Sequence, residues 1–275
     1  MTEAKGFDPR AYWEQRLTES YGLDGVGFAP LGLSYNRWLY RVRKHVFRRT
    51  VRRLLQKNRA EMRVLDVGVG TGFYVDQWRD LGVGQIVGLD LTETAVAHLK
   101  TAYPGMDFVV ADVGADSVPL EAGSFDIVSA FDVLFHIVDD ERYARAMKNI
   151  FELLKPGGYF VWSDNFLQRG RRDAGAHQVS RSLELSTQLL RDAGFEIVWR
   201  RPMFWLMNAP VDSTGRLLHA WWRRLMAVVR RGDRTGNFVG AMLFLPERAL
   251  TRLLRESPTT EIMVCRKPAA GEAAR

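Results

Sequence analysis

The sequence predicts an α/β protein with a mostly parallel sheet and helices on both of its faces. Short apolar runs alternate with segments in which apolar residues recur at helical spacing, an order typical of parallel strands joined by helical crossovers. One apolar run, residues 63–67, leads directly into a turn with glycine at alternate positions. A second junction, the Pro-Gly-Gly sequence of residues 156–158, separates a helical segment from another strand. We expect seven strands in all.

The length and composition are those of a globular protein. The chain has 275 residues, of which 47% are hydrophobic and 26% charged, so it can bury a sizeable core. Its single cysteine, Cys265, excludes an intrachain disulfide and a cysteine zinc cluster. No apolar stretch resembles a signal peptide or a membrane span, so we expect a cytoplasmic protein. The net charge of +7 permits an acidic partner such as nucleic acid or an anionic membrane.

The N-terminal segment is expected to be helical. A short helix begins at Pro9, and the glycine-rich residues 20–34 predict a loop. Residues 34–55 then place apolar side chains at helical spacing, with Ser34 or Asn36 as the N-cap. The opposite face of this helix is rich in arginine and is the most basic surface predicted for the chain.

The first strand and the turn after it organise the rest of the sequence. The turn has Gly68, Gly70 and Gly72, where a side chain would keep a ligand away from the backbone and where some positions need a positive φ. Residues 73–81 can form a helix whose N-terminal N–H groups face the ligand. The apolar run at residues 85–89 predicts the second strand.

An acid at the end of the second strand indicates the kind of ligand. Asp90 lies at the offset of roughly 20 residues expected for a carboxylate that binds a ribose. The turn departs from the G-x-G-x-x-G pattern of dinucleotide-binding proteins, because Phe73 occupies the sixth position counted from Gly68. Asp66, inside the end of the first strand, would repel a pyrophosphate but suits a ligand with an ammonium or sulfonium charge.

This combination of a glycine turn and two strand-end acids resembles the class I S-adenosylmethionine-dependent methyltransferases. The resemblance implies a Rossmann-like seven-stranded sheet whose seventh strand is antiparallel. It also implies that the turn packs against the amino-acid part of S-adenosylmethionine and that the acid after the second strand binds both ribose hydroxyls. The residues that carry it are Asp66, Gly68, Gly70, Gly72 and Asp90.

The third strand is expected to supply the adenine contacts. It follows a helix over residues 95–102 and spans residues 107–111. The resemblance assigns Asp112 and Val113 to the edge of the adenine, whereas a solvated carboxylate at a strand end is the alternative for Asp112. The predicted cofactor-binding set has three more members, which are Tyr12, Leu91 and Phe131.

The loop after the fourth strand, residues 125–130, is where this family often carries an aromatic residue and a histidine beside the transferable methyl group. The residues that match this pattern are Phe131, Asp132, Phe135 and His136. His136 is our candidate general base, because its pKa range suits removal of a proton from a hydroxyl group. One alternative is that His136 only packs against its neighbours or tethers the loop. A second candidate base is His219.

The remaining core elements follow in order. A helix over residues 140–154 ends at the Pro-Gly-Gly sequence, and the fifth strand spans residues 159–163; this junction is the second point of resemblance. A helix over residues 182–193 precedes the sixth strand at 195–200. The seventh strand, residues 260–266, should run antiparallel beside it.

The sequence therefore divides into a core and two covering parts. Residues 1–61 form an N-terminal helical lid, residues 62–201 and 260–267 form the cofactor-binding core, and residues 202–259 form a mainly helical insertion. The insertion has two amphipathic segments. One of them is a basic, tryptophan-rich helix, which could also contact a membrane surface. The large apolar residues of the insertion either line an acceptor pocket or build the core of the lid. They are Trp221, Trp222, Met226, Phe238, Met242 and Phe244.

We expect a methyltransferase that uses S-adenosylmethionine to methylate an oxygen of a small-molecule acceptor, such as a natural product, a sugar or a lipid-like compound. An RNA methyltransferase is one alternative, which the basic charge favours. Nucleic acid is nevertheless not expected as a partner, because the Asn/Asp-Pro-Pro-Tyr/Phe motif is absent after the fourth strand. A non-methylating protein that binds S-adenosylmethionine is the other alternative. The chain would be a monomer or a homodimer.

A metal-assisted transfer is a further hypothesis. Asp132 and the Asp164-Asn165 pair loosely resemble the magnesium ligands of catechol-type O-methyltransferases. Asp132 lies one residue further along the chain than the metal-binding aspartate of that family. The lysine base of that family has no counterpart here. No metal is therefore expected.

Overall fold

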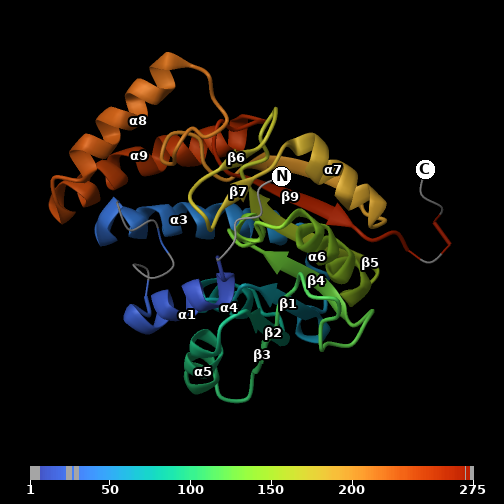
Figure 1. The fold of residues 1–275 in the computed structure, drawn as a ribbon. Helices are drawn as coiled ribbons and strands as arrows, with labels where there is room; N and C mark the ends of the chain where they lie inside the picture. The colour runs from blue at the N-terminus through green and yellow to red at the C-terminus, as the bar shows by residue number, and fades with distance from the viewer. Residues whose placement is uncertain (1–6, 23–26, 28–30, 270, 273–275) are drawn as a thin grey trace.

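The computed structural model describes residues 7–22, 27, 31–269 and 271–272 (Figure 1). One sheet forms its centre, with the strand order β3-β2-β1-β4-β5-β9-β8. Neighbouring strands are parallel from β3 to β5, and β9 is antiparallel to both β5 and β8. The predicted sheet, including its antiparallel seventh strand, is confirmed. The strands are β1 (Arg63–Val67), β2 (Gln85–Asp90), β3 (Asp107–Val110), β4 (Phe125–Ala130), β5 (Leu154–Asp164), β8 (Glu196–Pro202) and β9 (Glu261–Arg266).

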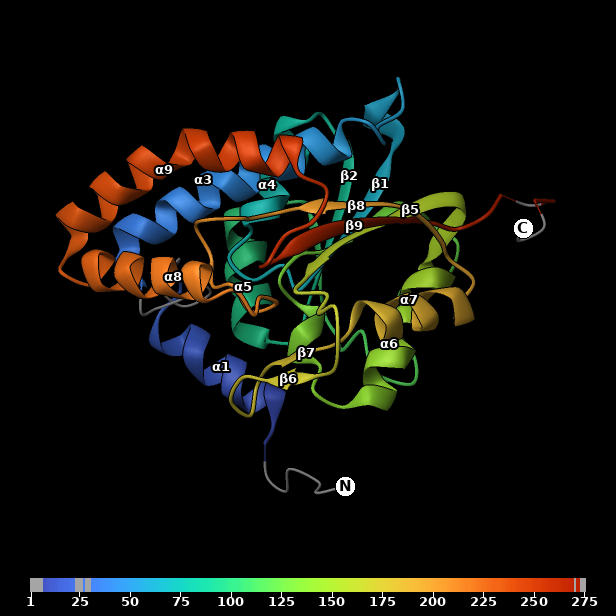
Figure 2. The ribbon, with the colours of Figure 1, turned by 90° about the horizontal axis from the view of Figure 1, so that it is seen from above.

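Helices cover both faces of this sheet (Figure 2). Alternate residues of β1 explain the two layers: Val64 packs with α3 and α4, whereas Leu65 and Val67 pack with α6 and α7. The helices are α1 (Pro9–Glu19), α3 (Gly32–Val51), α4 (Phe73–Asp80), α5 (Glu93–Ala102), α6 (Asp140–Leu153), α7 (Leu183–Asp192), α8 (Arg216–Val229) and α9 (Asp233–Leu253), with short 3₁₀ turns at η2 (Arg59–Glu61) and η3 (Leu134–His136).

The strand order reverses beside β1, which fixes the place of the ligand site. β1 pairs with β2 on one side and with β4 on the other, and Val67 lies opposite both Leu89 and Ala130. The loops after these strands therefore leave the same edge of the sheet in different directions, and open α/β sheets bind ligands in the crevice formed there.

Helix α3 begins earlier than predicted. It starts at Gly32, inside the expected loop, whose residues 23–26 and 28–30 lie outside the described residues. Neither Ser34 nor Asn36 is its N-cap; Asn36 donates its side-chain amide to the Gly32 carbonyl. The Ser34 N–H instead donates to Asp233 at the start of α9. A residue so distant in the chain could not be found from local capping patterns.

The insertion forms a helical hairpin on the outside of α3. Helix α9 includes Gly236 and Gly240 in its first half. A side chain at Gly240 would overlap the indole of Trp38, so the glycine allows α3 and α9 to pack closely. Within the described residues, no helix combines the length and apolarity that a membrane crossing requires.

A small hairpin after β5 was not predicted. Its strands, β6 (Arg172–Asp173) and β7 (Val179–Ser180), pair with each other and lie outside the central sheet. Strands of two residues are too short to produce a periodic pattern in the sequence.

Candidate cofactor and acceptor site

The glycine turn has the geometry that its sequence demands. Gly68, Gly70 and Gly72 all have positive φ, at 69°, 51° and 82°. The Gly68 N–H donates to the Leu89 carbonyl at 2.7 Å, which ties the turn to the end of β2. A side chain at Gly68 would overlap Val133 of the loop after β4. The turn therefore keeps bare backbone at the carboxyl edge of the sheet.

Two buried carboxylates flank the turn. Asp66 accepts a hydrogen bond from the Ser129 hydroxyl at 2.7 Å, and burial raises its pKa to about 7. Asp90 accepts from the Gly70 N–H at 2.8 Å and from the N–H and hydroxyl of Thr92. Burial also raises the pKa of Asp90. A bound group with positive charge would favour the ionised form of both acids.

The ends of β2 and β3 share a cavity. Leu91 and Asp112 line this cavity, which has a volume of about 270 Å³. Asp112 accepts from the Gly114 N–H at 2.7 Å and forms an ion pair with Arg142, so protein groups hold its carboxylate. Val113 is buried beside it. The other lining residues come from α6 and the start of α1: Arg142, Asp8, Pro9 and Arg10.

Hydrogen bonds fasten the N-terminal segment across this edge. The Glu14 carboxylate of α1 accepts from the N–H groups of Glu93 and Thr94, at 2.8 and 2.9 Å, at the start of α5. The Tyr21 hydroxyl donates to the Gly70 carbonyl at 3.1 Å. These contacts place α1 over the glycine turn and the ends of β2 and β3.

Aromatic rings of α1 cover the loop after β4. The Tyr12 ring stacks on His177 with a centroid distance of 4.9 Å, and Trp13 meets His136 edge-on at 4.7 Å. Nδ1 of His136 lies 2.7 Å from the His177 carbonyl, which can only accept, so Nδ1 carries the proton and Nε2 is the basic atom. Burial lowers the pKa of His136 to about 4, so its ring is neutral at pH 7.

The first residues after β4 contribute a second polar group. Asp132 has a left-handed backbone, with φ of 57°, which costs a non-glycine residue about 1–3 kcal/mol. Two contacts hold this conformation. Asp132 accepts from Nε of Arg43, on α3, at 2.7 Å, and its N–H donates to the Ser163 hydroxyl at 2.8 Å.

A buried tyrosine hydroxyl lies within electrostatic range of Asp132 and Asp66. The ring of Tyr74, in the first turn of α4, stacks on Phe131 with a centroid distance of 4.4 Å. Its hydroxyl is buried and has no hydrogen-bond partner among the described residues. Burial raises its pKa well above the ordinary value, and the nearby charges of Asp132 and Asp66 raise it further. Tyr74 was not among the predicted site residues, although its position two residues after Gly72 of the glycine turn was a usable signal.

Sequence comparisons with known proteins identify the family of this chain. The family model described as "Methyltransferase domain" matches residues 65–162. A ubiquinone biosynthesis O-methyltransferase of Xanthomonas axonopodis is 33% identical over 177 residues, which cover 60% of this chain and 70% of that protein. The chain belongs to the class I S-adenosylmethionine-dependent methyltransferases.

Two further proteins agree with this family. A probable S-adenosylmethionine-dependent methyltransferase of Mycolicibacterium smegmatis is 29% identical over 67% of this chain and 69% of its own length. The crystal structure of the N-methyltransferase NodS from Bradyrhizobium japonicum, in complex with S-adenosylhomocysteine, covers 95% of this chain and 100% of NodS. The superposition of this chain on NodS has a TM-score of 0.55 at 14% sequence identity, so the two proteins share a fold. The chain is thus an S-adenosylmethionine-dependent methyltransferase, and S-adenosylmethionine is its cofactor.

The methyltransferase site fits this cofactor. S-adenosylmethionine supplies a methyl group on a positively charged sulfur, and the chain must orient it and keep water away. The glycine turn leaves room for its amino-acid part, and the buried acids at both sides suit its positive charges. The predicted cofactor residues near the turn and the cavity lie along one edge of the sheet, whereas Tyr12 lies against His177.

The candidate pocket residues of the insertion lie in two different environments. Trp222, Met226 and Phe244 pack with α3 in the core, and Phe238 and Met242 point to solvent, with 64% and 62% of their surfaces exposed. The second candidate base, His219, has Nε2 2.7 Å from the Ser213 carbonyl within the insertion.

The proposed magnesium ligands have other partners. Asp132 is paired with Arg43, and Asp164 accepts from the Asn165 N–H at 2.6 Å. The Asn165 amide donates to the Ser180 hydroxyl. No group of three or more His, Cys, Asp or Glu side chains within the described part of the chain could hold a metal ion.

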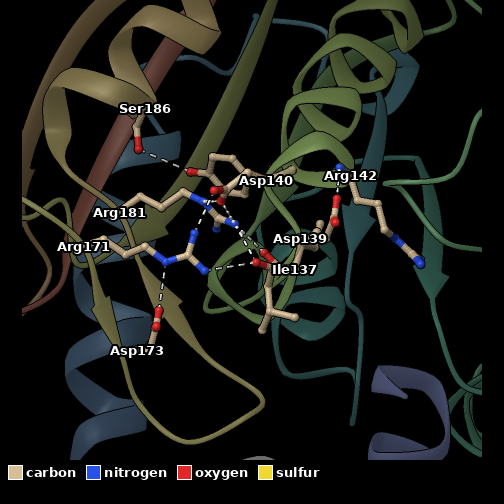
Figure 3. A network of polar contacts seen from close by, with 10 residues as sticks. Ile137, Asp139, Asp140, Arg142, Arg171, Asp173, Arg181 and Ser186 are labelled. Carbon is tan, nitrogen blue, oxygen red and sulfur yellow. Dashed lines mark hydrogen bonds and ion pairs between the residues drawn. The ribbon is translucent and has the colours of Figure 1, made fainter. Parts of the chain in front are cut away.

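A polar network connects the β6–β7 hairpin to the loop that holds His136 (Figure 3). Arg181 is 1% exposed and donates to Asp140 at 2.8 Å and to the Ile137 carbonyl at 2.9 Å. Arg171 donates to the same Asp140 and to Asp173. The hairpin also carries His177, so this network determines where the His177 carbonyl meets His136.

Proposed function

We propose that this methyltransferase methylates a hydroxyl oxygen of a small-molecule acceptor, with His136 as the general base. The observation that carries the proposal is the hydrogen bond between Nδ1 of His136 and the His177 carbonyl. It leaves Nε2 as the proton acceptor, in a ring that is neutral at physiological pH. The printed name of the Xanthomonas relative, an O-methyltransferase of ubiquinone biosynthesis, supports the same chemistry and a small, partly apolar acceptor.

In this mechanism Asp66, the glycine turn and Asp90 would hold the cofactor, and Leu91, Asp112, Val113 and Phe131 would contact its nucleoside. The acceptor would lie beside the loop after β4, where Trp13 of α1 meets His136. Its hydroxyl gives a proton to Nε2 of His136 as the methyl group is transferred. Residues 1–61 act as a lid over this site, and residues 202–259 form a separate covering insertion on the core of 62–201 and 260–267.

The experiment is an assay of methyl transfer to hydroxylated aromatic, sugar and prenylated phenol acceptors, each tested beside its amine analogue. His136→Gln should lower turnover of the hydroxyl acceptors by at least about 100-fold and leave cofactor affinity unchanged. His219→Gln is the matched control and should behave as the wild type. Turnover of His136→Gln close to that of the wild type would exclude His136 as the base.

The same assay separates the alternatives. Transfer only to the amine analogues would contradict O-methylation. Transfer to RNA, with steeply salt-dependent binding, would favour an RNA methyltransferase. Cofactor binding without any transfer would favour a non-methylating protein. A lipid-like acceptor would be met at a membrane; peripheral membrane contact, a monomeric or dimeric state and a cytoplasmic location stay predictions.

A further inference from the structure

Positive charge is concentrated in one part of the chain. Residues 32–53 and 216–255 together contain 17 Arg and Lys but only two acids, a net charge of +15. The whole chain carries +7, so the remaining residues carry −8. These two segments are α3 and the α8–α9 hairpin, which are far apart in the sequence.

The charged segments form one layer of the molecule. Helix α9 packs along α3, and α8 lies beside them both (Figure 2). Gly236, Gly240, Glu247 and Thr251 of α9 are buried on its inner side. Glu247 accepts hydrogen bonds from the N–H groups of residues 205 and 206, which fastens α9 to the loop after β8. The orientation of α9 about its own axis is therefore fixed.

The outer side of α9 carries an apolar stripe. Phe238, Met242, Leu245 and Leu253 are 64%, 62%, 67% and 77% exposed. Their spacing follows one face of the helix, on which Ala249 also lies. Leu217, on the neighbouring helix α8, is 87% exposed. Removal of this apolar surface from water would be favourable, so a partner that covers it would be stabilised.

Exposed arginines stand at both ends of the stripe. Arg234 precedes Phe238 by four residues and Arg252 follows Leu245 by seven, so both share its face. An apolar stripe between arginines matches the boundary of a bilayer, where acyl chains accept the apolar groups and lipid phosphates accept the guanidinium groups. Nucleic acid would satisfy the arginines but would gain little from a stripe of which only Phe238 is aromatic.

We propose that the α9 stripe and its flanking arginines dock the enzyme on an anionic membrane surface. The charge asymmetry orients the molecule, with the α3–α8–α9 layer toward the lipid and the acidic remainder away from it. This inference deepens the proposed function, because a lipid-like acceptor would be reached from that surface, but docking itself does not require the chemistry to be correct.

The test is co-sedimentation of the full-length protein with vesicles. Binding is expected to vesicles of phosphatidylcholine with roughly 30% phosphatidylglycerol, to weaken in high salt, and to be poor on phosphatidylcholine alone. The triple variant F238S/M242S/L245S should lose at least about tenfold in affinity. R234Q/R252Q should bind more weakly and with a lower salt dependence. L185S, which changes an apolar residue 40% exposed on α7, is the matched control and should bind as the wild type.

Other outcomes would overturn the proposal. Unchanged binding of the triple variant would exclude the stripe. Binding of an RNA oligomer that is lost in R234Q/R252Q, without vesicle binding, would identify nucleic acid as the partner. A dimer that the triple variant converts to a monomer, again without vesicle binding, would identify a second copy of the chain. Methyl transfer to a soluble acceptor, measured without vesicles, should be the same in all variants, so failure of docking and failure of the proposed chemistry are distinguishable.

Discussion

At the scale of single residues, Asp66 has opposite effects on folding and on binding. Its pKa is about 7 in the folded protein, because it is buried, and 3.8 is its ordinary value. The folded state therefore resists ionisation, and this group makes stability fall as the pH rises from about 4 to about 7. A carboxylate kept in such a place needs a compensating positive charge, which the cofactor would bring.

Asp66→Asn is expected to stabilise the ligand-free protein more at high pH than at low pH. The gain in unfolding free energy should grow from about 1–2 kcal/mol at pH 5 to about 4 kcal/mol at pH 8. Urea unfolding at the two pH values measures it. Asp107→Asn, an exposed change on β3, serves as the control. Equal stability of Asp66→Asn and the wild type at pH 8 would contradict the burial argument.

Asp90→Ala should weaken S-adenosylmethionine binding by about 1.5–3 kcal/mol, because the ribose hydroxyls would lose a charged acceptor. Titration calorimetry with S-adenosylmethionine and S-adenosylhomocysteine gives the value. Since Asp90 also accepts from Gly70 and Thr92, the melting temperature of the ligand-free variant must be recorded beside it. Unchanged affinity for both ligands would remove Asp90 from the cofactor site.

Tyr74→Phe should leave the ligand-free protein as stable as the wild type, or about 1 kcal/mol more stable, because it removes a buried hydroxyl without a partner. Turnover or ligand affinity should fall if a bound molecule uses that hydroxyl. Tyr103→Phe removes a hydroxyl that donates to the exposed Asp76 and provides the comparison. A large loss of stability in Tyr74→Phe would mean that a protein group or a water already satisfies the hydroxyl.

At the scale of elements, α1 is attached to the core by a few polar contacts. Glu14 occupies the N-terminus of α5, where four N–H groups lack partners within the helix. Glu14→Gln should speed cofactor dissociation several-fold, because a neutral amide is a weaker acceptor for those N–H groups. Stopped-flow displacement of S-adenosylhomocysteine measures the rate. Glu19→Gln, on the same helix, should not change it.

The elements also show what the sequence could and could not predict. The core strands and the turn at Gly68 to Gly72 depend on local periodicity and local backbone demands, which the sequence displays directly. The Arg43–Asp132 pair joins residues 89 positions apart, and the Asp233 contact with Ser34 spans 199. Such contacts depend on how helices pack, and no pattern near either residue announces them. The β6–β7 hairpin was missed for a different reason, its two-residue strands.

At the scale of the whole molecule, cofactor binding should protect backbone amides at the carboxyl edge of the sheet from hydrogen exchange. S-adenosylmethionine at 100 times its dissociation constant should add about 2.7 kcal/mol to the unfolding free energy. Hydrogen exchange should slow in α1, in the turn after β1 and at the start of α5, while α9 exchanges as before. Protection spread evenly over α9 would contradict a ligand site confined to the carboxyl edge of the sheet.

The place at which the insertion leaves the sheet has an evolutionary consequence. Pro202, the last residue of β8, is paired with Glu261, the first residue of β9, so residues 203–260 depart from and return to neighbouring points of one strand pair. Such a segment can be lengthened, shortened or replaced without a change in strand order, provided that the replacement covers the exposed side of α3. The outer surface of related enzymes can then change by exchange of this single segment, while the residues at the carboxyl edge of the sheet stay the same.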